Sequence, residues 1–431
     1  MCQQHSESVE TSQQASGQPL SSNDPGTPKE PFPWDTGVFD AHCHPTDTMV
    51  SVASIPDMKA RALTVMSTRS QDQDLVSGVA LERGVKDIDI LFSPTPSAQE
   101  RVIPSFGWHP WFSYQLYDDL DSNPTYDGTP SGKIAHYDKI LAPSPSSKDV
   151  SFSEGLPDPR PLSDFLKETR VRLEKHPLAL VGEIGLDKAF RLPQSWTSSY
   201  EIQRDESLTP GGREGRLLSP HRVQMTHQAV VLQAQLKLAG EMGRPVSVHG
   251  VQAHGVLYDT IAQCWEGHEK EVLSRREKRE IAEGAEDFSS DSEDEDNNIK
   301  AQSRIRSKLK KLSLQHETSG PKPYPPRICI HSFSGHVGML KQYIHPSVPA
   351  KVFFSFSVAI NWGTGGGDKT EEAVRAVPDD RILVESDLHT AGEQMDQNLE
   401  EACRRICQIK GWDLREGVER LARNWREFVF G

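Results

Sequence analysis

The stretch Phe39-Asp40-Ala41-His42-Cys43-His44 combines a short apolar run with two histidines at alternate positions. Side chains along a β-strand point to opposite faces in turn, so His42 and His44 lie on the same side of such a strand. Two imidazoles that converge at the end of a strand suit a divalent transition-metal ion. The stretch therefore predicts a strand that ends in two metal ligands.

Seven further short runs, apolar or β-branched, follow this stretch along the chain. Several are almost continuously apolar, as in parallel strands that are covered by helices. Helical patterns separate many of them, and strand–helix alternation repeated about eight times predicts an α/β fold of the (β/α)₈ TIM-barrel type. The eight predicted strands are Val38–His42, Ala62–Ser67, Val102–Gly107, Leu178–Ile184, Pro245–His249, Ile328–Phe333, Val352–Phe356 and Ile382–Ser386.

The clearest helical pattern follows Ser219-Pro220, with apolar residues at helical spacing up to Leu238. Serine suits the N-cap of a helix, proline suits its first turn, and Gly240 or Gly243 can end it. Another helix is predicted over Leu162–Glu174. Both helices fit the outer layer of a barrel.

The composition along the chain predicts one barrel domain at 37–431, preceded by a disordered tail at 1–36 that is rich in Ser, Gln, Pro and Gly. Insertions at about 113–159 and 190–218 follow the third and fourth predicted strands, so we expect them on the face of the barrel that carries active sites. A third insertion, at about 283–326, precedes the sixth strand. It is acidic, and we expect it to be disordered and to lie on the opposite face.

Residues able to bind a metal ion recur at the ends of the later predicted strands. A charged residue there is hard to explain by packing, because burying it without a partner costs several kcal/mol. Each residue alone could be a hydrogen-bonded residue at a strand end, but the ends of barrel strands converge on one mouth. Together with the two histidines above they predict a metal site. The four residues are Glu183, His249, His331 and Asp387.

Several motifs resemble the TatD family of metal-dependent hydrolases and deoxyribonucleases, both in sequence and in order. The resemblance runs from about residue 38 to the end, interrupted by the three insertions. The long insertions and the ending Glu-Ser-Asp-Leu-His look most like a fungal branch described as interactors of a cell-cycle protein. The motifs are FDAHCH (39–44), GWHP (107–110), GEIGLD (182–187), HSFSG (331–335), RILVESD (381–387) and LARNW (421–425).

The resemblance implies two divalent metal ions. His42, His44 and Asp387 would bind the first, His249 and His331 the second, and Glu183 would bridge them. Four histidines with carboxylates suit Zn²⁺ or Mn²⁺, and Mg²⁺ less comfortably.

The expected reaction is hydrolysis of DNA phosphodiester bonds. Two bridged cations lower the pKa of a shared water, so that hydroxide is available near neutral pH. Asp387 is the candidate general base as well as a ligand, and Glu183 is expected to be essential. His109, in the GWHP motif, is expected to contact the substrate or to have a structural role. Asp40 is expected to orient a ligand histidine.

Two departures from the family pattern leave the substrate open. Val251 stands where many members have Arg or a similar polar residue, and Leu388-His389-Thr390 stands where many have a Pro. Hydrolysis of another ester or amide is therefore the alternative within enzymes. The alternative outside enzymes is a barrel that mainly binds a protein partner through its insertions.

The charge of the chain, −14 overall, is concentrated outside the predicted barrel. Eight acidic residues and no Lys or Arg lie in 283–298, and without that segment and the tail the net charge is about −2. No run approaches the ~18 apolar residues of a membrane span, and the six scattered cysteines indicate free thiols. We expect a monomer in the cytoplasm or nucleus, without membrane attachment.

Overall fold

A computed structural model gives the structure of the protein, and it describes residues 30–147, 150–202, 204–272, 320–363 and 367–431. Eight strands form one sheet, in which every hydrogen-bonded pair of neighbours is parallel. The strands, in the order of the sheet, are β1 (Phe39–Cys43), β2 (Ala62–Met66), β3 (Val102–Phe106), β7 (Leu180–Asp187), β9 (Val246–Val251), β10 (Arg327–Ile330), β11 (Lys351–Phe356) and β12 (Ile382–Val384).

The sheet closes between its first and last strands, just beyond their carboxyl ends. The backbone N–H of Asp387 donates to the carbonyl of His42 at 3.0 Å, and that of His44 donates to the carbonyl of Leu388 at 2.8 Å. The fold is therefore a (β/α)₈ TIM barrel, and all eight predicted strands are confirmed as its members.

Two strands end two or more residues earlier than the sequence predicts. β10 ends at Ile330 and β12 at Val384, so His331 and Asp387 lie in the segments that follow. Ser332 has φ +41° and Asp387 has φ +54°, a left-handed conformation in which the backbone leaves the strand.

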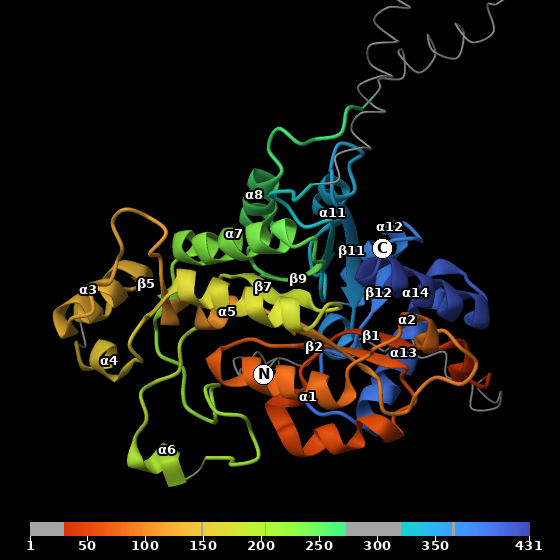
Figure 1. The fold of residues 1–431 in the computed structure, drawn as a ribbon, viewed down its shortest axis with the longest axis horizontal. Helices are drawn as coiled ribbons and strands as arrows, with labels where there is room; N and C mark the ends of the chain where they lie inside the picture. The colour runs from red at the N-terminus through yellow and green to blue at the C-terminus, as the bar shows by residue number, and fades with distance from the viewer. Residues whose placement is uncertain (1–29, 148–149, 203, 273–319, 364–366) are drawn as a thin grey trace, which may run out of the picture.

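Helices surround the barrel (Figure 1). Within the described residues, no helix is both long enough and apolar enough to span a membrane. The α-helices outside the insertions are α1 (Ser70–Arg83), α2 (Ile88–Leu91), α5 (Leu162–Lys175), α7 (Met225–Glu241), α8 (His254–Cys264), α11 (Val337–Tyr343), α12 (Gly367–Ala376), α13 (Glu393–Lys410) and α14 (Leu414–Val429). The 3₁₀- and π-helical segments there are η2 (Trp34–Thr36), η3 (Pro45–Asp57) and η6 (Val358–Trp362).

The last helix, α14, closes the amino-terminal end of the barrel. Asp413 caps it by accepting from the backbone N–H groups of Arg415 and Glu416. Asn424 donates to the carbonyl of Ile382 at the start of β12, and the ring of Trp425 stacks on Phe39 of β1. These two contacts explain the LARNW motif, because Asn424 and Trp425 attach α14 to the starts of two strands. The helix therefore does not cover the carboxyl end of the barrel.

The predicted start of α7 is wrong. The helix begins at Met225, because Arg222–Val223 forms the short strand β8 and pairs antiparallel with β5 (Leu141–Ala142). This pairing is a tertiary contact that a local pattern does not reveal. The predicted end is confirmed, since Gly243 has φ +65° just after the helix, and α5 matches its predicted range.

The first two insertions lie on the same side of the barrel (Figure 1, left). The first packs around a hydrophobic cluster that includes its own Tyr137 together with Trp108 and Phe165 from the flanking segments, and the second contains α6 (Ser198–Ile202). The first insertion holds η4 (Pro110–Gln115), β4 (Leu116–Tyr117), α3 (Pro130–Ile140), β5, η5 (Pro145–Ser147), α4 (Val150–Gly155) and β6 (Arg160–Pro161).

Parts of the predicted tail and of the third insertion lie outside the described residues. Residues 1–29 of the predicted tail and most of the acidic third insertion are among those that the structure does not describe. Phe32 and Trp34 pack against the core of the barrel. The described contacts of the barrel therefore begin before the predicted boundary at residue 36.

Candidate metal centre

Glu183, on β7, lies at the centre of the candidate site, and its two carboxylate oxygens face different histidines. Oε2 lies 3.3 Å from Nε2 of His44 and 3.5 Å from Nε2 of His42. Asp387 approaches the same pair, with its Oδ1 3.6 Å from Nε2 of His44 and 3.9 Å from that of His42. This half of the site contains the three residues that the sequence assigned to one metal ion.

The other oxygen of Glu183, Oε1, faces three imidazoles. It lies 2.8 Å from Nε2 of His331, 3.0 Å from Nδ1 of His249 and 3.2 Å from Nε2 of His109. The barrel thus brings together all six residues that the sequence singled out as ligands. It also places His109 against the central carboxylate. The sequence alone had not decided whether this residue contacts the substrate or has a structural role.

The spacing of the ring nitrogens fits two metal positions. Nε2 of His42 lies 3.0 Å from Nε2 of His44, and Nδ1 of His249 lies 3.2 Å from Nε2 of His331. Two ligands of one tetrahedral ion with bonds of about 2.0–2.1 Å lie about 3.3 Å apart. Each pair therefore needs only a small adjustment to share an ion, and nitrogen and carboxylate donors suit a divalent metal.

The site is buried, and its pKa values reflect its mixture of carboxylates and imidazoles. Burial alone would raise the pKa of Glu183, but the surrounding His109, His331 and His42 bring it well below the usual range. Burial opposes charge on His249, but hydrogen bonds to Asp187 and Glu183 raise its pKa to about 9. Burial lowers the pKa of His109 to about 4. The central carboxylate is therefore ionised and ready to bind a cation.

His42 is held by a serine rather than by Asp40. Its Nδ1 lies 2.8 Å from Oγ of Ser247, a buried residue on β9. Asp40 instead accepts from the backbone N–H groups of His42 and Ser386, each at 3.0 Å. Our expectation that Asp40 orients the imidazole itself is wrong, because this carboxylate ties the end of β1 to the segment after β12.

His249 is held by Asp187, a residue that our sequence interpretation gave no role. Oδ2 of Asp187 lies 3.1 Å from Nε2 of His249, so the other nitrogen of the ring faces Glu183. The same oxygen accepts from Nε1 of Trp111 at 2.6 Å. Asp187 is four residues after Glu183 on the same strand, and this even spacing could have revealed it.

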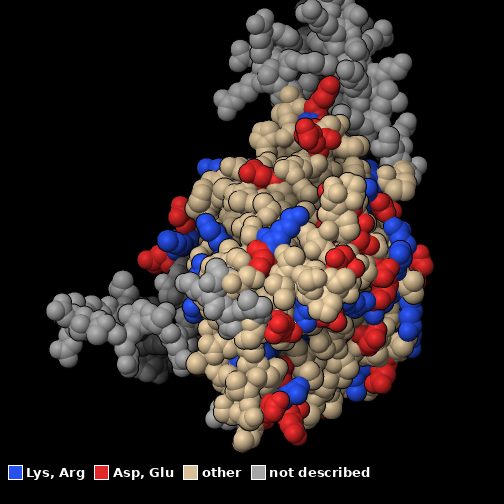
Figure 2. All heavy atoms as spheres, turned by 90° about the vertical axis from the view of Figure 1, so that its left-hand side faces the viewer, with Lys and Arg blue, Asp and Glu red and all other residues tan. Residues whose placement is uncertain are grey.

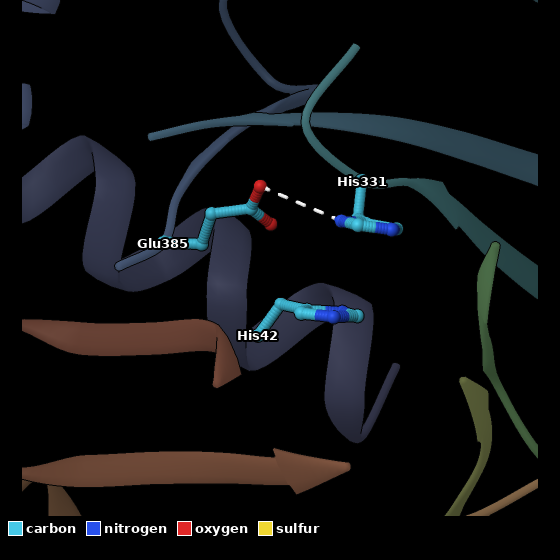
Figure 3. Close-up of side chains that lie close together, drawn as sticks. All are labelled: His42, His331 and Glu385. Carbon is cyan, nitrogen blue, oxygen red and sulfur yellow. Dashed lines mark ion pairs between the residues drawn. The ribbon is translucent and has the colours of Figure 1, made fainter. Parts of the chain in front are cut away.

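His331 has a carboxylate neighbour, Glu385, that was also missed. Oε1 of Glu385 lies 3.7 Å from Nδ1 of His331, and the ring of His331 stacks on that of His42 with centroids 3.9 Å apart (Figure 3). Glu385 is fully buried and accepts hydrogen bonds from Ser332 and Ser355. Its position two residues before Asp387 was the signal, since His42 and His44 have the same spacing.

A pocket opens onto the site, and its wall includes residues outside the ligand set. Acidic and basic side chains are interspersed over the face of the molecule that carries the insertions (Figure 2). His389, one of the departures from the family pattern, lies in the pocket wall. The lining residues are His44, Asp47, Thr68, His109, Trp111, Phe112, Glu183, His249, Asp387 and His389.

The second insertion is fastened beside this pocket by Arg69. The guanidinium is buried and pairs with Asp47 at 2.9 Å and Asp72 at 3.1 Å. It also donates to the carbonyls of Thr209 and Pro210 in the insertion. The guanidinium of Arg69 is thus bonded to groups of this chain, and its role is to hold the pocket wall in place.

A barrel with a cluster of histidines and carboxylates at the carboxyl ends of its strands is typical of a hydrolase. Residues 39–429 match the family described as TatD related DNase. The chain therefore belongs to the TatD family of hydrolases, as the motifs indicated.

The chain is similar to two curated relatives and to one solved structure. Cut9-interacting protein scn1 of Schizosaccharomyces pombe is 36% identical over 91% of this chain and 98% of its own length. The uncharacterized deoxyribonuclease YMR262W of Saccharomyces cerevisiae is 24% identical over 68% of this chain and 67% of its own. YJJV, a TatD homologue from Escherichia coli, is 14% identical, with a TM-score of 0.47 over 92% of this chain and 98% of that structure.

Proposed function

We propose that the protein is a deoxyribonuclease that hydrolyses phosphodiester bonds with two divalent metal ions. The observation that carries this proposal is the position of Glu183, whose two oxygens face two separate groups of ring nitrogens. A carboxylate in this position suits a bridge between two ions. His42, His44 and Asp387 would hold one ion, and His249 and His331 the other.

The charge of the site supports two ions. Carboxylates are costly to bury unless a positive charge compensates them. Glu183, Asp387, Asp187 and Glu385 are all buried around the four histidines and together carry four negative charges when ionised. Two divalent cations would balance them while leaving the imidazoles neutral, which is the form that binds metal.

The residues of the chain have separate roles in this reaction. Bound divalent ions would lower the pKa of a water molecule and neutralise the charge that develops on the phosphate. Asp387 lies at the mouth beside His44 and would accept the proton of the attacking water. His109 lies in the pocket wall against Glu183 and would contact the substrate there.

DNA is the proposed substrate because the family description and the name of the budding-yeast relative both specify a deoxyribonuclease. The ten described residues that line the pocket include no Lys or Arg. The metal ions would therefore supply the positive charge that meets the phosphate. Another ester or an amide remains the competing substrate class for the same centre.

The test is an assay of DNA and RNA degradation with a matched inactive variant. Single-stranded DNA, duplex DNA and RNA are incubated with metal-loaded wild type and with Glu183→Ala. We expect wild type to degrade DNA and the variant not to do so. If the wild type holds metal but all three nucleic acids stay intact, the nuclease proposal fails and ester and amide substrates are the next to assay.

A protein partner is a second proposal, favoured by one comparison. The 36% identical relative is named as a Cut9-interacting protein, and the two described insertions extend from one side of the barrel (Figure 1). A purified candidate partner should bind wild type and Glu183→Ala equally, if binding uses the insertions. Equal loss of binding and metal in Glu183→Ala would place the partner at the metal centre instead.

A further inference from the structure

Asp187 connects three parts of the molecule through its two carboxylate oxygens. Oδ2 contacts Nε2 of His249 at 3.1 Å and accepts from the indole N–H of Trp111 at 2.6 Å. Oδ1 accepts from the backbone N–H groups of Ala189 at 2.7 Å and Phe190 at 2.9 Å. The carboxylate thus joins a candidate metal ligand, the pocket wall and the first residues of the second insertion.

The surroundings hold Asp187 in one place. Its side chain is about 1% exposed, and its backbone N–H and carbonyl both bond to the side-chain amide of Gln228 on α7, at 2.8 and 2.9 Å. A carboxylate anchored at both backbone and side chain has little freedom to follow its neighbours. A change in the hydrogen bond between Asp187 and His249 should therefore change the hydrogen bond that the same oxygen accepts from the indole of Trp111.

Trp111 is well placed to show such a change. It lines the pocket, its ring stacks on Phe190 with centroids 4.8 Å apart and planes 12° apart, and it meets the ring of His109 edge to face at 4.7 Å. A metal ion on Nδ1 of an imidazole makes the N–H at Nε2 a stronger donor, and neighbouring hydrogen bonds polarise one another. The indole bond should then weaken when His249 binds a metal.

We propose that Asp187 is a positioning residue that holds His249 with Nδ1 toward the metal ion and couples occupancy of that metal position to Trp111 in the substrate pocket. The proposal rests on the metal centre of the proposed function. It assigns to Asp187 no contact with the metal or the substrate.

The first measurement is metal affinity, obtained by competition of the full chain with a chromophoric chelator for Zn²⁺. Asp187→Asn keeps the shape of the side chain and removes its charge. We expect it to weaken one of two zinc affinities by about 10–100-fold, as for other partners of metal-bound histidines. The other affinity should change less, because His42, His44 and Asp387 and their own hydrogen-bond partners are unchanged.

Ser247→Ala is the matched control, because Ser247 contacts the far nitrogen of His42 on the other side of Glu183. It should weaken mainly the other zinc position, and the double variant should show a loss at both positions. If both variants weaken the same position, or Asp187→Asn changes neither, Asp187 does not position His249.

The second measurement is the fluorescence of Trp111, taken as the difference between wild type and Trp111→Phe during zinc titration. It does not depend on the folding of Asp187→Asn. We expect the difference signal to change with zinc and to follow the affinity that Asp187→Asn weakens. A signal that is the same in metal-free and zinc-saturated protein overturns the coupling.

Failure of the metal centre itself gives a different result. Wild type that binds no zinc contradicts the proposed function as well as this inference. Wild type that binds two zinc ions with unchanged affinities in Asp187→Asn contradicts this inference alone.

Discussion

The two sides of Glu183 are built in different ways. On the Oε2 side, His42 lies in β1 and His44 directly follows that strand, two residues further along the chain. The far nitrogen of His42 contacts a neutral serine. On the Oε1 side, His109, His249 and His331 come from three different strand ends. Buried carboxylates accompany two of those rings. The positions of His42 and His44 on the Oε2 side follow from their spacing in the chain. The positions of the three rings on the Oε1 side depend on closure of the whole barrel and on the buried carboxylates beside them.

Loss of the carboxylate that both sides share should have the largest effect. Glu183→Ala should lower kcat on DNA by about 10³-fold, because two metal ions contribute several kcal/mol and each 1.36 kcal/mol is tenfold in rate. Steady-state kinetics at saturating metal measure this effect. Glu183→Gln, which keeps the size of the side chain, serves as the matched variant, and near-normal kcat in it would show that the bridging charge is dispensable.

Removing one histidine from each side should separate the two metal positions. His42→Ala and His249→Ala should each weaken one position by about 100-fold or more, since even loss of a ligand's hydrogen-bond partner costs 10–100-fold. Isothermal titration with Mn²⁺ would resolve the two affinities. Both variants losing the same position would mean that the two sides of Glu183 form a single site.

Metal binding on the Oε1 side should depend on pH. Without metal, the pKa of His249 is about 9 despite its burial, because Asp187 and Glu183 stabilise the imidazolium. The ring is then protonated at pH 7, and a metal ion must displace the proton. Affinity should rise at least tenfold per pH unit between 7 and 9, because His331, whose pKa Glu183 and Glu385 also raise, has a proton to lose as well. Titrations in buffers of different ionisation enthalpy measure the released protons, and none released at pH 7 would contradict this order.

His109 should give the smallest effect on the reaction. His109→Asn can still accept from the backbone N–H of Trp111, as Nδ1 of His109 does at 3.1 Å, but loses the group facing Glu183. We expect kcat to fall about tenfold, the cost of one hydrogen bond to a charged group, with metal content unchanged. Loss of one metal ion in elemental analysis would instead make His109 a ligand.

The sequence predicted the strands and the histidines and carboxylates that cluster at their ends, because both follow simple patterns. Apolar runs mark the eight strands, and a polar residue that closes such a run stands out. Asp187 and Glu385 were missed because each shares a strand or its end with a more obvious ligand. Both lie at even spacing from that ligand, so the period-two rule that paired His42 with His44 applies to them as well.

The insertions were harder to predict, because tertiary contacts determine them. Their place on the mouth side follows from the order of strands and helices. The β5–β8 pairing that delays α7 joins segments about 80 residues apart in the chain, which no local pattern encodes. The same holds for Arg69, whose bonds to Thr209 and Pro210 fasten the second insertion.

The most direct test of the two-sided centre is a crystal structure of the Mn²⁺-loaded protein with anomalous diffraction. The account predicts two anomalous peaks, one among His42, His44, Asp387 and Oε2 of Glu183, and one among His249, His331 and Oε1 of Glu183. A single peak, or none, under saturating metal would contradict it.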